Sequence, residues 1–116
     1  MKKIAIIGST AYEKKMVAYK EHLEESGQQY EVRLPALDHM PDLNELDICS
    51  HNREMIEWAE EVHLIWDGRS IGTLFDLGMA FALRKPLVIQ DINPKMFLNF
   101  LNQYEIDSLV RSEKNG

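Results

Sequence analysis

The sequence predicts one α/β domain built on a parallel sheet of four or five strands, with helices on both faces. Two observations support this fold class. Short apolar runs rich in β-branched residues alternate along the chain with longer segments in which apolar residues recur every three or four positions. Gly and Pro residues separate these segments. Strands that alternate with helices form a parallel sheet, because each connection crosses a face of the sheet to reach the next strand.

The individual elements follow from local patterns. Four strands are predicted at Lys3–Gly8, Tyr30–Leu34, Val62–Trp66 and Leu87–Gln90. Four helices are predicted at Tyr12–Ser26, Asn44–Glu61, Thr73–Arg84 and from Asn93 to about Tyr104, with Gly27 ending the first. Residues 106–110 fit either a fifth, edge strand or a helical turn, and Pro35 and Pro41 bracket a connector that is either a lid or a plain link. Right-handed crossovers then restrict residues 1–116 to one doubly wound sheet of the flavodoxin-like or Rossmann-like kind.

Composition narrows the function classes. The apolar fraction of 45% and the charged fraction of 28% are those of a globular domain. A net charge of -6 argues against binding to a nucleic acid polymer, and no apolar stretch approaches the roughly 20 residues that span a membrane. The single cysteine excludes an internal disulfide, and the histidines show no spacing typical of a metal site. We therefore expect a cytoplasmic protein that uses no metal and no other cofactor.

The fold class predicts where a ligand binds. In a doubly wound sheet, ligands lie outside the carboxyl ends of the strands, where the strand order reverses. For the order 2-1-3-4-5, that point lies between the first and third strands. The loops that follow these strands begin at Gly8-Ser9 and at Asp67-Gly68, so we expect two segments far apart in sequence to converge.

The turn into the third helix has the composition of an anion site. Gly68 and Gly72 allow close approach of the backbone, and the N-terminus of a helix favours a negative group. The hydroxyls of Ser70 and Thr73 add hydrogen-bond donors. The spacing matches neither a dinucleotide-binding fingerprint nor a Walker A loop.

Asp76 is the one carboxylate in an otherwise apolar helix, and two interpretations fit it. With Thr73 it forms a T-x-x-D pattern, a variant capping box at the helix N-terminus. Alternatively it faces a cleft and acts chemically. Gly78 favours the second interpretation, because a glycine weakens a helix interior by about 1 kcal/mol and suggests close approach of a ligand or backbone.

These residues resemble those of the nucleoside 2-deoxyribosyltransferase family, including its relatives that hydrolyse deoxynucleoside monophosphates. The family segment Ser-x-Gly-x-x-x-Glu-Leu-Gly-x-Ala-x-Ala is similar to Ser70–Ala82 here, with Asp76 in place of the Glu. The resemblance implies that Asp76 is the nucleophile that attacks the anomeric carbon of the sugar. It leaves Asp67 or Glu54 as the assisting acid, because Glu54 stands where the family often carries an Asp.

The same resemblance implies the contacts of the substrate, a nucleoside or nucleotide. Ser9, Ser70 and the Gly72 amide, together with Gly8, would hold the sugar or a 5′-phosphate. Arg69 is a candidate phosphate partner. Tyr12 either stacks on the base or belongs to the core.

A second resemblance leaves a non-catalytic function open. Residues 66–73 are similar to the W-D-G-x-S-x-G-T segment of SLOG-type Rossmann-like domains, which bind nucleotide-derived ligands and often catalyse nothing. The sequence therefore supports two hypotheses, an enzyme acting at an N-glycosidic bond and a nucleotide-sensing module.

A homodimer is also expected. The deoxyribosyltransferase resemblance implies it, because related enzymes complete their sites with residues from a neighbouring subunit. Two predicted helices add large apolar residues beyond what a thin domain readily buries: Trp58, Phe97, Phe100 and Leu101.

Overall fold

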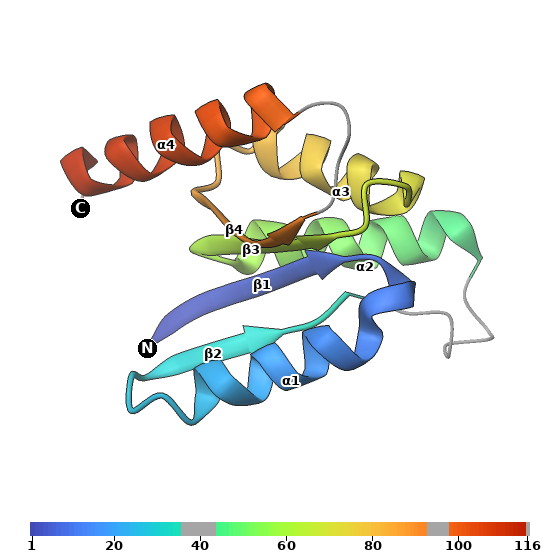
Figure 1. Cartoon of the computed structure of the whole chain (residues 1–116), viewed down its shortest axis with the longest axis horizontal. Coiled ribbons are helices and arrows are strands. Elements are labelled where there is room, and N and C mark those ends of the chain that lie inside the picture. The colour runs from blue at the N-terminus through green and yellow to red at the C-terminus, as the bar shows by residue number, and fades with distance from the viewer. Residues whose placement is uncertain (36–43, 93–97, 116) are drawn as a thin grey trace.

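The computed structural model describes residues 1–35, 44–92 and 98–115 (Figure 1). All four strands of its sheet are parallel, in the order β2-β1-β3-β4, as predicted: β1 (Lys2–Gly8), β2 (Tyr30–Arg33), β3 (Glu61–Trp66) and β4 (Leu87–Ile92). The helices between and after them are η1 (Thr10–Tyr12), α1 (Glu13–Glu24), α2 (Glu45–Trp58), α3 (Ile71–Ala82) and α4 (Leu98–Asn115). The doubly wound α/β fold is therefore confirmed.

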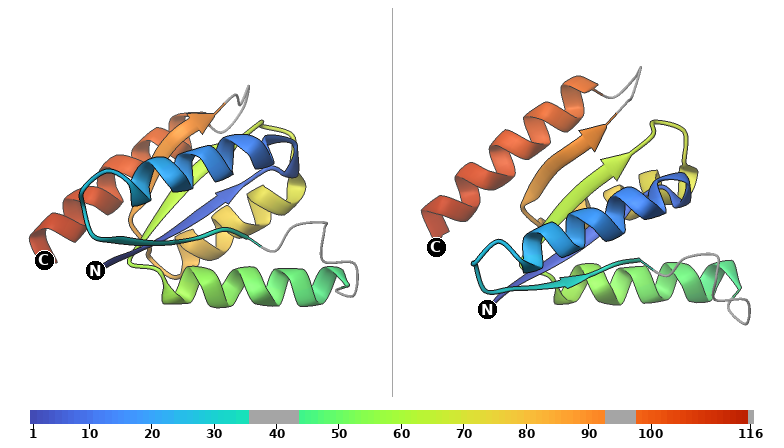
Figure 2. Two further views of the ribbon diagram at one scale, coloured as in Figure 1. Left: turned by 90° about the horizontal axis from the view of Figure 1, so that it is seen from below. Right: turned by 60° about the horizontal axis from the view of Figure 1, so that its bottom comes forward.

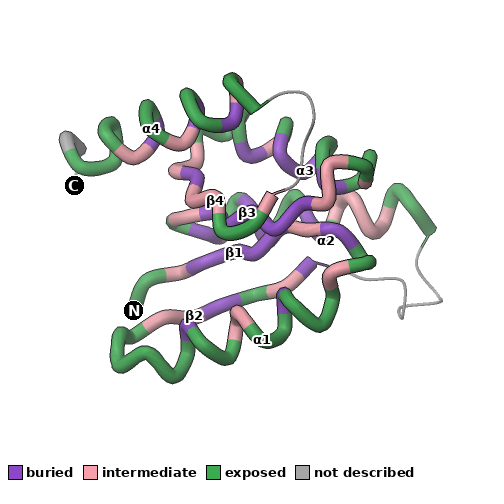
Figure 3. Tube along the Cα trace, in the orientation of Figure 1, coloured by how far each residue is buried: buried purple, intermediate pink, exposed green. Residues whose placement is uncertain are grey.

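The helices lie on both faces of the sheet, α1 on one side and α2 with α3 on the other (Figure 2). Alternate side chains of β1 explain this division. Ile4 and Ile6 pack with α1 in one buried cluster, whereas Ala5 and Ile7 belong to a larger cluster with α2, α3 and α4. The central strands β1 and β3 are the most continuously buried part of the chain (Figure 3). Burial on both faces is what a parallel sheet requires.

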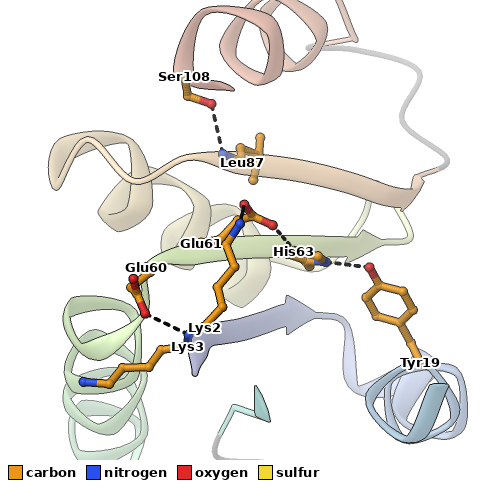
Figure 4. Close-up of polar contacts among 8 residues, drawn as sticks. All are labelled: Lys2, Lys3, Tyr19, Glu60, Glu61, His63, Leu87 and Ser108. Atoms are coloured by element: carbon orange, nitrogen blue, oxygen red, sulfur yellow. Dashed lines mark hydrogen bonds and ion pairs between the residues drawn. The ribbon is translucent and has the colours of Figure 1, made fainter. Parts of the chain in front are cut away.

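Helix α4 occupies the place where a fifth strand was an alternative. Residues 106–110 belong to this helix, which lies beside β4. Two of its side chains accept hydrogen bonds from backbone N–H groups of the edge strand: Ser108 Oγ from Leu87 at 2.9 Å, and Glu105 Oε2 from Ile89 at 2.5 Å. Figure 4 shows the Ser108 contact. An edge strand whose donors are paired in this way is a poor template for a further strand.

A chain of polar side chains joins α1 to the sheet (Figure 4). Tyr19 Oη lies 2.5 Å from His63 Nδ1, and His63 Nε2 lies 2.7 Å from Glu61 Oε1. The other carboxylate oxygen of Glu61 is 2.7 Å from Lys2 Nζ. The hydrogen bond from His63, with that from Lys2, lowers the pKa of Glu61 to about 2. His63 is thus held by structural partners on the α1 face.

Several predicted boundaries are wrong, each for a local reason. Helix α2 ends at Trp58, not Glu61, because Glu61 already pairs with β1. Leu46, in the first turn of α2, is 75% exposed although it is apolar. Helix α3 starts at Ile71, two residues before the predicted Thr73. The Pro35–Pro41 connector and the predicted start of the fourth helix lie largely outside the described residues.

None of the described helices is long and apolar enough to cross a membrane.

Candidate functional site

The two loops predicted to converge do meet. Ser9, which follows β1, donates from Oγ to Asp67 Oδ1 at 2.9 Å, and the backbone N–H of Asp67 donates to the same hydroxyl at 3.2 Å. Ser9 is buried, so these bonds satisfy its side chain. The predicted contact of Ser9 with a substrate remains a prediction, since its hydroxyl is occupied in holding the two loops together.

The turn after β3 is shaped by its own side chains. Asp67 Oδ1 accepts from the backbone N–H groups of Arg69 (2.8 Å) and Ser70 (2.9 Å), and Trp66 Nε1 donates to the Ser70 carbonyl (3.0 Å). Gly68 has a φ of 78°, in the left-handed region that favours glycine. The N–H of Arg69, with the other donors, holds the pKa of Asp67 below its ordinary value. A carboxyl group with a lowered pKa is a poor proton donor at neutral pH, so the geometry favours a structural role for Asp67 over the predicted acid role.

A cavity of about 240 Å³ opens beside these loops, between α2 and the first turns of α3. Five residues that the sequence analysis singled out line it: Gly8, Ser70, Gly72, Thr73 and Asp76. Gly8 is also required by packing, because a Cβ there would stand 2.5 Å from the carbonyl oxygen of Ile65. The cavity lies outside the ends of β1 and β3, where the strand order reverses, which is the position that this fold class predicts for a ligand.

Asp76 brings a buried carboxyl group to this cavity. Asp76 is only 4% exposed, and Asn52 Nδ2 donates to its Oδ2 at 3.2 Å. Burial raises the pKa of Asp76 to about 7, and the hydrogen bond from Asn52 opposes that rise. Near neutral pH the group therefore exists in both protonation states, which suits a carboxyl that reacts with a substrate.

The capping interpretation of Asp76 is wrong. Ser70 is the N-cap of α3, and its Oγ accepts from the Thr73 N–H at 3.2 Å and from Thr73 Oγ1 at 3.0 Å. Asp76 lies one turn further into the helix, with Asn52 of α2 as its partner. Gly78 does not face the cavity either: it is exposed, and a Cβ there would meet no atom within 4 Å. The ligand approach inferred from Gly78 is therefore not on the cavity side of α3.

The remaining predicted site residues lie around the cavity without lining it. Arg69 is exposed on the turn. Tyr12 packs partly against the α1-side core, with Lys15 Nζ 4.5 Å from its ring centroid. Glu54 lines a neighbouring cavity of about 270 Å³ together with Arg33 and His51. The structure thus brings neither of the two proposed acids into the cavity beside Asp76.

Sequence reasoning missed five residues that line the cavity: Thr10, Pro35, Ile48, Cys49 and Asn52. Cys49 and Asn52 are three positions apart on α2, so they share one side of that helix. This spacing was visible in the sequence. Which side of α2 faces the site depends on how the helix lies across the sheet, and no local pattern reports that.

Fold and cavity together define a class: a Rossmann-like α/β domain with a carboxylate-bearing cavity at the switch point of its sheet. A scan of protein-family models finds no family that matches the chain, and a search of curated proteins finds no significantly similar sequence. Within the described residues, no group of three or more His, Cys, Asp or Glu side chains is placed to hold a metal ion.

Proposed function

We propose that this protein cleaves or transfers the N-glycosidic bond of a nucleoside or nucleoside monophosphate, with the Asp76 carboxylate as nucleophile. The observation that carries the proposal is the position of Asp76, a buried carboxyl that lines the switch-point cavity. The resemblance of residues 70–82 to nucleoside 2-deoxyribosyltransferases supplies the substrate class. The cavity volume of about 240 Å³ is small and suits a sugar better than a whole larger ligand.

The reaction forms and breaks one bond at the anomeric carbon. An Asp76 oxygen bonds to that carbon while the bond to the base nitrogen breaks, and the base leaves with the electron pair and gains a proton. Water, or a second base, then attacks the same carbon and releases Asp76. This is the sequence of a retaining glycosidase, in which the nucleophile must be ionised. Only the ionised fraction of Asp76 is competent, so its raised pKa limits the reaction below about pH 7.

The first turn of α3 would position the substrate. Gly72 in that turn and Thr10 after β1 line the same cavity as Asp76. Backbone N–H groups at a helix N-terminus and hydroxyl groups suit sugar hydroxyls or an anionic group. Arg69 is exposed on the adjoining turn, and its guanidinium is a candidate partner for a 5′-phosphate.

A nucleotide-binding module without turnover is the second candidate. One observation favours it: Asp76 is the sole carboxyl group among the described residues that line the cavity, so no neighbouring acid there assists the leaving base. A neutral, protonated Asp76 would then donate a hydrogen bond to the ligand instead of attacking it.

Base release is the direct test of the enzymatic proposal. The protein is incubated with deoxynucleosides, ribonucleosides and their 5′-monophosphates, and free base is separated by chromatography; adding a second base detects transfer. We expect release by the unmodified protein and none by Asp76→Asn. Asp107→Asn, which removes a carboxylate from α4, is the matched control and should retain activity. Equal rates of base release by the Asp76→Asn and Asp107→Asn variants would contradict the role of Asp76 as nucleophile.

Alkylation of the single cysteine measures ligand binding independently of base release. Cys49 lines the same cavity as Asp76, so a bound ligand should slow its alkylation by iodoacetamide. At a ligand concentration ten times Kd, the rate should fall about tenfold. Protection by a nucleoside or nucleotide without base release would support the binding module. If no compound of the panel protects Cys49 and none is converted to free base, both the enzymatic proposal and the binding module are contradicted.

A further inference from the structure

A second cavity, of about 270 Å³, is lined by the end of β2 and by α2, beside the cavity that Asp76 lines. Two buried residues, Pro35 and Asn52, line both cavities, so the two spaces adjoin across them. Asn52 is also the residue that donates a hydrogen bond to Asp76 Oδ2. A ligand whose reacting carbon lies at Asp76 therefore has space for its next group beyond Asn52.

The second cavity has polar side chains that the first one lacks. Arg33, in β2, and His51 and Glu54, on α2, line the second cavity and not the first. Leu34 and Met55 supply apolar walls. Apolar walls with a few polar groups are typical of a site for a small organic molecule. An anionic group is disfavoured there, because it would lie in the same cavity as the carboxylate of Glu54.

Arg33 and Glu54 bring opposite hydrogen-bonding groups to this cavity. The guanidinium carbon of Arg33 lies 4.0 Å from the ring centroid of Trp58. Contact of this kind leaves N–H groups of the guanidinium for hydrogen bonds. Arg33 thus supplies donors, and Glu54 supplies an acceptor. Donors and an acceptor within one small cavity complement the polar edge of a nucleobase, which carries both kinds of group.

We propose that the second cavity binds the base of the nucleoside or nucleotide, and that Glu54 selects bases that carry an exocyclic amino group. This inference rests on the proposed function, in which the sugar lies at Asp76. Arg69 precedes the N-terminus of α3, Asp76 lies one turn into that helix, and Asn52 separates Asp76 from the second cavity. Phosphate, sugar and base follow one another in the same order in a nucleoside monophosphate. Tyr12, the earlier candidate for stacking on the base, lines neither cavity.

The selection follows from the chemistry of a carboxylate, which accepts hydrogen bonds and donates none. Adenine, cytosine and guanine each present an amino group with N–H donors. In a thymine or uracil nucleoside the remaining ring N–H lies between two carbonyl oxygens, which a carboxylate repels. Glu54 therefore favours the amino-bearing bases, while Arg33 donates to the ring nitrogen or carbonyl oxygen beside the amino group.

The fluorescence of Trp58 measures binding of a free base without any bond cleavage. Arg33 contacts the Trp58 ring, so a base that binds the donors of Arg33 should change the emission of Trp58. Cytosine and uracil are matched in size, and we expect cytosine to bind about tenfold more tightly. Trp58→Phe should remove the signal, because Trp66, the other tryptophan, is buried and does not line this cavity. Equal affinities for the two bases, or no change in emission with either, would overturn the proposal.

A change of one side chain tests the role of Glu54. Glu54→Gln keeps the size of the side chain and adds an N–H donor for carbonyl oxygens. The variant should therefore lose the preference for cytosine by binding uracil more tightly. Glu57→Gln is the matched control, since Glu57 is also exposed on α2 but lines neither cavity. A preference that is unchanged in Glu54→Gln would overturn the selection by Glu54.

Base release separates this inference from the proposed function on which it rests. The unmodified protein should release base from deoxycytidine about tenfold faster than from deoxyuridine at low substrate concentration. Selective binding of cytosine without base release from any substrate would contradict the enzymatic proposal and leave the base site standing. Equal release from deoxycytidine and deoxyuridine would support the enzymatic proposal and overturn the selection by Glu54.

Discussion

Asn52 Nδ2 donates a 3.2 Å hydrogen bond to Asp76 Oδ2, and this bond joins α2 to α3 beside the cavity that both residues line. Both side chains are buried. Burial raises the pKa of Asp76, and the amide donor opposes that rise because it favours the charged carboxylate. Asn52 therefore favours the ionised form of Asp76. It is a positioning residue for any chemistry that Asp76 performs.

Asp76→Asn should stabilise the protein at high pH. The folded-state pKa of Asp76 is raised from 3.8 to about 7, so the folded state holds the proton more tightly than the unfolded state. The resulting stability is fully present below about pH 4 and is lost as the pH rises through about 7. Urea unfolding should show equal stability for both proteins near pH 4, and a gain of about 2–4 kcal/mol for the variant near pH 8.5. A gain that does not change with pH would contradict the burial of a titrating carboxyl.

The rate of base release should rise with pH around neutrality. A nucleophile must be ionised, and the pKa of Asp76 is about 7, so activity should increase between about pH 6 and pH 8. Asn52→Ala removes a donor that favours the charged form, and the midpoint of the profile should move to higher pH. Arg53→Ala, the exposed neighbour on the same helix, should leave it in place. A rate that rises toward low pH would instead show that Asp76 acts in its protonated form.

Arg69 should distinguish monophosphates from nucleosides. If its guanidinium contacts a 5′-phosphate, monophosphates should bind about ten- to a hundredfold more tightly than the matching nucleosides, as charge-assisted contacts are worth about 1.5–3 kcal/mol. Arg69→Ala should remove most of that preference, and Arg111→Ala on α4 should not. Calorimetric titration of both ligand types measures the difference. Equal affinities of the unmodified protein for a nucleoside and its monophosphate would contradict a phosphate contact at Arg69.

Ser108→Ala should destabilise the domain through the edge of the sheet. Ser108 Oγ accepts the backbone N–H of Leu87 at 2.9 Å, and both residues are buried. Without that acceptor a buried donor is left unpaired, which costs about 1–3 kcal/mol of unfolding free energy. Ser112→Ala, an exposed position on the same helix, should change the stability by less than about 0.5 kcal/mol. Urea denaturation of the two variants compares them directly, and equal effects would rule out the edge contact as the cause.

Much of the site could be predicted from the sequence, because it depends on the order of the strands along the chain. The strand order predicts that the loops after β1 and β3 meet, and the bond between Ser9 and Asp67 confirms it. The role of Asp67 was harder to predict. A carboxylate beside a ligand loop suggests proton chemistry, but only the folded turn shows that its oxygen accepts from Arg69 and Ser70.

The sequence by itself determined the parallel sheet, its strand order and the position of the cavity, because hydrophobic periodicity and right-handed crossovers are properties of the chain. Only the tertiary structure decided which face of each helix is buried, which lines the cavity and which is exposed. The T-x-x-D pattern suggested that Asp76 caps α3, yet Ser70 is the cap and Asp76 bonds to Asn52, 24 positions away. The exposure of Ile71 and Phe75 on α3 was also decided by the fold. Nearly every position of α3 is apolar, so hydrophobic periodicity does not distinguish its buried face from its exposed one, and the sheet beneath α3 makes that choice.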